Sequence, residues 1–332
     1  MQSRTQLLTP SALRLDSRLP LELRSLSFQI LPAPPPPSAS ATHPPTAPPA
    51  QADGYALVSH GLTTVSSSVY GPREPMRNGA WSGGDKGGAS KGDKAQVNVE
   101  VGVAGWGERV GSGAASEGGV RRGGKDRRTL ELATSLKNTF EPVLLLHLYP
   151  RSSIDIYIQV LENDGSTLQA AINATTLSLI SAGLPLSDYV CALSLASYPS
   201  LPPLGPRQIP PFALSTPAAA FSNAPDATGS GSTVLLDLVA EEERNLPCLT
   251  VAVLPRSGKV TLVNLETRVG VGRFEEMLRW GVEGGRTVQG AMEEAVRAWA
   301  NSLAAPSKTL ASLFPGMAGA GKGGDEDEDM DL

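Results

Sequence analysis

The chain has 332 residues and a formal net charge of −5, with 28 Lys and Arg against 33 Asp and Glu. This length allows one large domain or two ordinary ones. The negative balance argues against a generally basic nucleic-acid binder, although it allows a local basic patch. The 35 glycines and 28 prolines are clustered, so the folded part is smaller than the length suggests.

Cysteine and histidine usage limits the chemistry. Cys191 and Cys248 both lie in apolar contexts, and we expect buried free thiols in a reducing compartment. The three histidines are scattered and no metal-ligand spacing is present, so we predict no metal and no cofactor. No apolar run approaches the roughly 20 residues of a membrane helix, and no signal-peptide core begins the chain. We therefore expect an intracellular protein with no membrane partner.

The first part of the chain predicts strands interrupted by segments of low complexity. Residues 21–31 predict a strand that runs into a proline tract, which cannot join a ladder. Residues 53–70 predict two strands broken at Gly61, so the tract is expected to interrupt a hairpin. Alternating valines predict a further strand at 95–106.

The middle of the chain predicts a helix, a strand and a second helix. Apolar residues at helical spacing indicate a helix at 129–148, with Thr129 as its cap and Pro142 as a bend or a break. Alternating isoleucines predict a strand at 154–161. The second helix is expected to begin at the turn 165–167.

The remaining pattern completes a mixed α+β fold. Strands are predicted at 189–196, 232–239, 249–254 and 259–266, followed by a helix at 270–303. The order of strands and helices indicates mixed α/β layers. Composition divides the chain into an N-terminal segment at 1–20, a single domain at 21–304 with low-complexity inserts at 32–51, 77–94, 107–126 and 197–231, and a disordered acidic tail at 305–332.

Three groups of residues could carry chemistry. The first is Gly165-Ser166-Thr167, where a glycine turn before a helix N-terminus forms an anion site. A serine or threonine in that place is more often an ordinary helix cap, and we favour the cap on the residues alone.

The second group is basic and the third is acidic. Five cations that precede a helix suit a phosphate backbone, although a solvated loop without a partner is equally compatible. Clustered carboxylates could hold a metal or act as general acids, but a solvated acidic strand end is the usual case. The basic group is Arg121, Arg122, Lys125, Arg127 and Arg128. The acidic group is Asp237, Glu241, Glu242 and Glu243.

Several motifs, taken together, resemble one family. RLDSRLPLELR resembles the RxDGRxxxExR opening of the RNase PH family, with Ser17 at its glycine. DGYALVSHGLTTVSSSVYGPREP resembles the hairpin that ends in a YGP turn, and LLDLVAEEE resembles the DLxxxED segment. The matching stretches are 14–24, 53–75, 127–132, 147–194 and 235–243. Within the family, the central block is most similar to a ring subunit of the eukaryotic RNA exosome, the counterpart of the archaeal catalytic subunit.

The resemblance implies a fold, an assembly and a location. The fold would be RNase PH-like, built from βαβα units of the ribosomal protein S5 domain 2 type. The assembly would be a ring of related subunits around a channel for single-stranded RNA. Its other partners would be S1/KH cap subunits and a hydrolytic nuclease, in the nucleus, including the nucleolus, and in the cytoplasm.

The resemblance also implies an altered active centre. In phosphorolytic members, an arginine follows the Gly-Ser or Gly-Thr of the phosphate turn. Here Gly165, Ser166 and Thr167 remain, but Leu168 stands at the arginine position. Arg128 matches a second phosphate-binding arginine. In the acidic segment, which includes Asp237, the family's acidic position falls on Glu243, and a further catalytic aspartate is replaced by Leu249.

These replacements favour a subunit without catalysis. Loss of the guanidinium removes a bidentate anion clamp, and loss of the aspartate removes a proton donor or metal ligand. We therefore predict a non-catalytic ring subunit that guides RNA for 3′–5′ processing and decay, including rRNA maturation and mRNA turnover. The alternative is an active phosphate-dependent 3′–5′ exoribonuclease. The predicted RNA contacts are Arg73, Arg121, Arg122, Lys125, Arg127 and Arg128.

Overall fold

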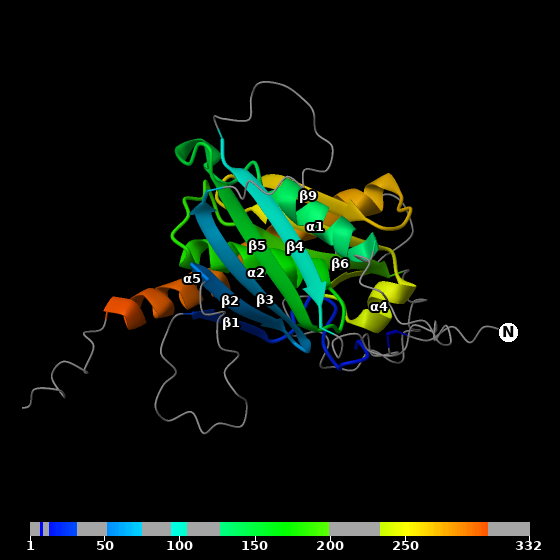
Figure 1. The fold of residues 1–332 in the computed structure, drawn as a ribbon. Helices are drawn as coiled ribbons and strands as arrows, with labels where there is room; N and C mark the ends of the chain where they lie inside the picture. The colour runs from blue at the N-terminus through cyan, green and yellow to red at the C-terminus, as the bar shows by residue number, and fades with distance from the viewer. Residues whose placement is uncertain are drawn as a thin grey trace, which may run out of the picture.

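The computed structural model describes residues 7–8, 13–31, 52–74, 94–104, 127–198 and 233–304. Within these residues, two β-sheets enclose a central helix, and further helices flank them (Figure 1). The predicted inserts and the tail lie outside the described residues, except Lys94, Ser197 and Tyr198. The mixed α+β class is confirmed.

The first sheet contains five strands in the order β1-β2-β3-β5-β4. Its strands are β1 (Leu26–Leu31), β2 (Gly54–His60), β3 (Thr63–Arg73), β4 (Gln96–Val103) and β5 (Ser153–Glu162). All neighbours are antiparallel except β4, which runs parallel to β5. Because β1 pairs with β2, the proline tract does interrupt a hairpin, as predicted. The first strand begins later than predicted, since Arg24 turns inward to bond Asp237.

The second sheet contains four antiparallel strands in the order β7-β6-β8-β9. They are β6 (Cys191–Tyr198), β7 (Thr233–Leu236), β8 (Cys248–Leu254) and β9 (Lys259–Leu265). Two bounds correct the prediction. Strand β6 extends two residues into the expected insert, and β7 stops before Asp237, whose φ of 52° leaves the extended region.

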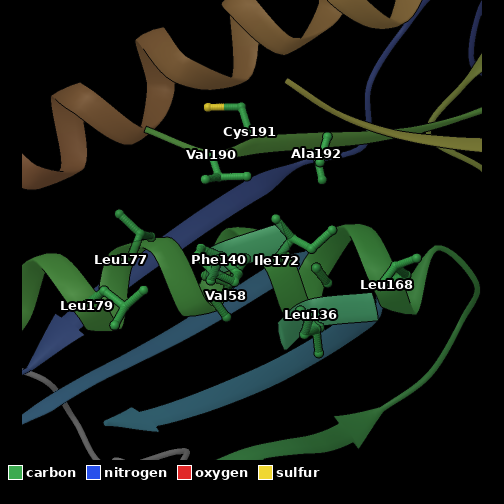
Figure 2. Close-up of a cluster of buried hydrophobic side chains, with 14 of the residues drawn as sticks. Val58, Leu136, Phe140, Leu168, Ile172, Leu177, Leu179, Val190, Cys191 and Ala192 are labelled. Atoms are coloured by element: carbon green, nitrogen blue, oxygen red, sulfur yellow. The ribbon is translucent and has the colours of Figure 1, made fainter. Parts of the chain in front are cut away.

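Helix α2 (Thr167–Ser181) lies between the two sheets and is buried on all sides. Its buried residues are mostly apolar, unlike those of a surface helix, and its buried polar side chains bond their neighbours, as Asn173 Oδ1 does by accepting from Ala192 N at 2.9 Å. Figure 2 shows Val190 and Ala192 pointing towards α2, whereas Cys191 points towards the opposite side of its strand. A Cβ at Gly54 would lie 2.3 Å from Ser178 O, so the glycine lets β2 approach α2 closely. This packing holds α2 between the two sheets, and the candidate site lies at the start of the helix.

Helix α1 (Arg127–Phe140) corrects the predicted helix at 129–148. It ends before Pro142, whose ring disfavours helical backbone in the preceding residue and lacks an N–H donor. A short 3₁₀ helix, η1 (Leu146–Leu148), follows. The helix also begins two residues earlier than expected, so Thr129 lies within its first turn and is not its cap.

Helix α5 (Val271–Ala304) packs on β6 and β8, on the side of the second sheet opposite α2. Its glycines permit this approach, because a Cβ at Gly284 would lie 2.4 Å from Leu193 Cδ2. Cys191 and Cys248 are buried free thiols, as predicted, and burial raises the pKa of each to about 12. Among the described helices, none has the length and apolar character that crossing a membrane requires.

Candidate functional site

The candidate site is built around the turn between β5 and α2. Gly165 has a φ of 89°, and a Cβ there would lie 2.6 Å from the backbone nitrogen of Ala240. Ser166 follows with a φ of 55°, also in the left-handed region. The turn therefore depends on glycine and on close contact with the segment that begins α4 (Ala240–Asn245).

The Ser166 hydroxyl holds two segments together and does not cap α2. It donates to Leu238 O at 2.9 Å and accepts from Leu238 N at 3.2 Å. It makes no capping bond to the helix, so the favoured cap interpretation is wrong. The neighbouring Thr167 hydroxyl donates to Asn163 Oδ1 at 2.8 Å. Both hydroxyls of the expected phosphate turn thus have protein partners.

Four further hydrogen bonds fix the backbone of the turn. Thr63 Oγ1 donates to Gly165 O at 2.8 Å and accepts from Asp164 N at 3.0 Å. Asp164 O accepts from Arg24 Nη1 at 3.1 Å and from Ala240 N at 3.0 Å. The turn is therefore held by β3, by the segment before β1 and by α4.

A cleft of about 1420 Å³ opens beside this turn. It is lined by the start of α1, the turn, α4 and the adjoining ends of β8 and β9. The structure brings together seven of the predicted site residues here, from three distant parts of the chain. They are Arg127, Arg128, Gly165, Ser166, Thr167, Leu168 and Glu243.

The cleft carries charges of both signs. Its cations are Arg127, Arg128 and Arg244, and its carboxylates are Glu131, Glu243 and Glu266. Arg127 Nε bonds Glu131 Oε1 at 2.9 Å in an exposed pair one helical turn apart. Surface pairs of this kind are weak and salt-sensitive. Among the described residues, the walls of the cleft therefore carry mixed charge, and the other three predicted cations lie outside the described residues.

Glu243 faces the turn itself. Its Oε2 accepts from the backbone N–H of Ser166 at 3.0 Å. Burial raises the pKa of this carboxyl, and Glu266 adds to the rise. The bond from Ser166 and the charge of Arg128 act in the opposite direction without cancelling it. Glu243 is thus a largely buried carboxylate beside the turn, and its neighbours only partly offset its charge.

Two of the other acidic residues, Asp237 and Glu242, form buried ion pairs, which corrects the prediction of a solvated cluster; Glu241 is exposed and pairs with Arg244 at 3.7 Å. Arg24 bonds Asp237 twice, from Nη2 to Oδ1 at 2.7 Å and from its backbone N to Oδ2 at 2.9 Å. Burial alone would raise the pKa of Asp237, but Arg24 holds it below its usual value. Arg14 bonds both oxygens of Glu242. Within the described residues, no group of acidic, histidine or cysteine side chains could hold a metal.

The buried arginines are the residues that the sequence reasoning missed. Arg14 also donates to the backbone carbonyls of Leu236 and Asp237, so it fixes the strand end that leads to α4. The signal was present in the RxDGRxxxExR motif, whose first and last arginines are Arg14 and Arg24. Ser17, at the motif's glycine position, has a φ of 65°, the left-handed conformation that glycine prefers.

Some predicted residues lie apart from the cleft. Leu249 is fully buried in β8, opposite Leu195 and Leu265. Arg73 is opposite Ser153 at the start of β5, whereas the turn follows its end, roughly 30 Å away at about 3.3 Å per residue. Arg121, Arg122 and Lys125 lie outside the described residues.

Comparisons with known proteins agree with this geometry. A family model described as the 3′ exoribonuclease family, domain 1, of RNase PH matches residues 47–185. The human exosome complex component RRP41 is 32% identical over 250 residues, covering 75% of this chain and 82% of that protein. The chain belongs to the RNase PH family. The RNase PH relatives also include SKI6, an exosome complex component of Saccharomyces cerevisiae, at 29% identity over 89% of this chain and 94% of that protein.

Solved structures confirm the predicted RNase PH-like fold. Rrp46 of rice (Oryza sativa) superposes with a TM-score of 0.59 at 20% identity, covering 86% of this chain and 100% of that chain. A chain from the Archaeoglobus fulgidus exosome with RNA bound to the active site gives a TM-score of 0.55 at 16% identity, covering 84% and 92%. Both chains thus share the overall fold of this protein.

Proposed function

We propose that the protein is a non-catalytic ring subunit of the RNA exosome. It would scaffold the ring and guide single-stranded RNA through the channel for 3′–5′ processing and decay. Support comes from relatives that cover most of the chain and are exosome complex components in human and yeast. The neighbours would be other RNase PH-like subunits, S1/KH cap subunits and a hydrolytic nuclease, in the nucleus, its nucleolus and the cytoplasm.

The proposal that the subunit is not catalytic rests on residue 168, which is a leucine. Leu168 is 7% exposed and belongs to the apolar cluster around α2 (Figure 2). A leucine there cannot supply the paired N–H donors that grip a phosphate. Removing one such donor from an anion-stabilising site costs about 2.7–4 kcal/mol of transition-state stabilisation. Leu168 would thus contribute to packing at the edge of the cleft and not to phosphate binding.

The acidic side supports the same conclusion. Leu249 is a core residue of β8, so no proton donor or metal ligand is available from that position. The Ser166 hydroxyl is already bonded to Leu238. A bound phosphate would have to break contacts that stabilise the fold.

The RNA path would use arginines at the mouth of the cleft. Arg127 and Arg128 begin α1 there, and the side chain of Arg127 is 92% exposed. With Arg121, Arg122 and Lys125 before them, they would contact the RNA backbone without sequence preference. Arg73, which lies over the Tyr70 ring at 4.8 Å, would be a separate contact near the other end of β5.

Charge reversal tests the RNA path. The ring is reconstituted with Arg127→Glu and Arg128→Glu together, and RNA protection is measured across a salt series. We expect weaker protection and a salt slope reduced by about one for each lost phosphate contact. Arg297→Glu is the matched control, because Arg297 forms a similar exposed pair with Glu293, distant in sequence on α5. Unchanged protection in an intact ring would contradict the assignment.

The alternative is an active phosphate-dependent exoribonuclease. One observation favours it: Arg128, Thr167 and Glu243 line the same cleft, so a phosphate, a cation and a carboxyl could still meet there. The two functions differ in one observable, the phosphate-dependent release of nucleoside diphosphates from RNA.

A further inference from the structure

The face of β3, β5 and β4 that lies away from α1 and α2 is not covered by a described helix (Figure 1). Tyr157 of β5 projects from this face and is 45% exposed. Its neighbours in the adjoining strands are Ser68 of β3, which is small, and Glu100 of β4. A large aromatic ring on this side of the sheet is therefore accessible to a partner.

An arginine is already held on the same face by a tyrosine and a carboxylate. The Arg73 guanidinium lies 4.8 Å from the centre of the Tyr70 ring. Arg73 Nη2 also pairs with Asp53 Oδ2 at 3.5 Å. A cation is attracted to the ring by its quadrupole, and the carboxylate adds a charge attraction. The contact shows how this face can bind a guanidinium.

Tyr157 and Asp155 repeat this combination one strand away. The Tyr157 and Tyr70 rings meet edge to face, with 5.5 Å between their centroids. Asp155 is opposite Tyr70 and two residues before Tyr157, so all three side chains project from one face. Asp155 Oδ1 accepts from Asn98 Nδ2 at 2.8 Å. Among the described residues, Asp155 Oδ2 has no hydrogen-bond partner and no cation lies over the Tyr157 ring.

The charge around the Tyr157 ring favours a cation. Burial raises the pKa of the Tyr157 hydroxyl, and the nearby charges of Asp155 and Glu100 raise it further. Arg73 acts in the opposite direction without cancelling the rise. The two carboxylates therefore create a locally negative potential, which attracts a basic side chain and repels RNA phosphates.

We propose that Tyr157, Asp155 and Glu100 form a docking site for an arginine in an extended, basic segment of a partner protein. The guanidinium would lie over the ring and pair with the carboxylates, as Arg73 does with Tyr70 and Asp53. Strand β4 is at the edge of the described sheet, so an extended segment could lie beside it and reach the ring with one side chain. The inference does not rest on the proposed function, because none of the three residues lines the cleft.

The test is a titration of the full chain with a short peptide that alternates arginine and serine, followed by backbone amide chemical shifts. We expect shifts centred on the parts of β4 and β5 around Tyr157. A peptide with citrulline in place of arginine keeps the shape without the charge, and it should cause no shifts there. Because each shift is assigned to a residue, attraction of the peptide to the acidic residues 325–331 is measured separately.

Substitutions identify the groups that bind the guanidinium. Tyr157→Leu removes the ring and should weaken binding at these amides about fivefold, whereas Tyr157→Phe should keep the affinity within about twofold. Asp155→Asn should weaken binding about threefold. Glu162→Gln is the matched control, because it removes an exposed carboxylate from the far end of β5 and should have no effect. The amide spectrum of each variant also shows whether it is folded.

Two results would overturn the inference. One is equal peptide affinity at these amides for the wild type and a folded Tyr157→Leu variant, or peptide shifts confined to other parts of the chain. The other is a set of shifts around Tyr157 with oligouridylate but not with the arginine peptide, since the surface would then bind RNA. Neither result bears on nucleoside diphosphate release by the reconstituted ring, so the proposed function is tested separately.

Discussion

Helix α4 carries two adjacent carboxylates, Glu242 and Glu243, whose surroundings differ. Glu242 points into the protein, where Arg14 neutralises it and Val239 N–H donates to it. Glu243 points into the cleft, where it receives the Ser166 N–H and faces Glu266. The interior side has kept a matched partner for its charge, and the cleft side has not. The comparison shows that α4 has a neutralised carboxylate on its interior side and an only partly compensated carboxylate on its cleft side.

The largest effect is expected on the interior side. Arg14→Met leaves Glu242 buried and unpaired, which should lower the free energy of unfolding by about 3–5 kcal/mol. Urea denaturation of the full chain measures this. Adding Glu242→Leu should restore much of the loss, because a buried pair can be replaced by apolar residues at little cost. A loss below about 1 kcal/mol in the single variant would show that the pair does not anchor α4.

The second-largest effect is expected on how the free energy of unfolding depends on pH, through Asp237. The pKa of this carboxyl is lowered in the folded state, so its stabilisation is present above its unfolded pKa and is lost as the pH falls through the lowered value. The stability advantage of the wild type over Asp237→Asn should therefore shrink below about pH 4. Parallel unfolding curves for the two proteins from pH 7 to pH 3 would contradict the Arg24 pairing.

The smallest effect is expected at Glu243, with the opposite sign. The folded pKa is raised, so the contribution of this carboxyl is most favourable at low pH and is lost as the pH rises through the raised value. Glu243→Gln should change stability by no more than about 1 kcal/mol, since the amide oxygen can replace the acceptor. Relative to this variant, the wild type should lose stability with rising pH. A slope of the same sign as at Asp237 would break the contrast between the two sides of α4.

Local pattern was enough to predict most of the fold. The alternating isoleucines of β5 and the apolar residues of α2 have periods that depend only on neighbouring residues. The bounds were less predictable where tertiary contacts decide them. Strand β7 ends at Leu236 because Asp237 turns to meet Arg24, more than 200 residues away. No local pattern contains that pairing.

The site was predictable in composition but not in geometry. Family resemblance identified Ser166, Leu168 and Glu243 as members of one centre, and the cleft brings them together. It did not separate Glu242 from Glu243, whose side chains diverge by about 100° because a helix has 3.6 residues per turn. The direction of each side chain depends on how α4 packs, which the sequence alone does not specify.

We propose that the subunit keeps the RNase PH fold without phosphorolytic activity. The most direct test supplies the reconstituted ring, without its hydrolytic nuclease, with single-stranded RNA and inorganic phosphate, and measures nucleoside diphosphates. We predict no phosphate-dependent release with the wild-type subunit or with Arg128→Ala. Phosphate-dependent release by the wild-type ring that disappears in the Arg128→Ala ring would contradict the account.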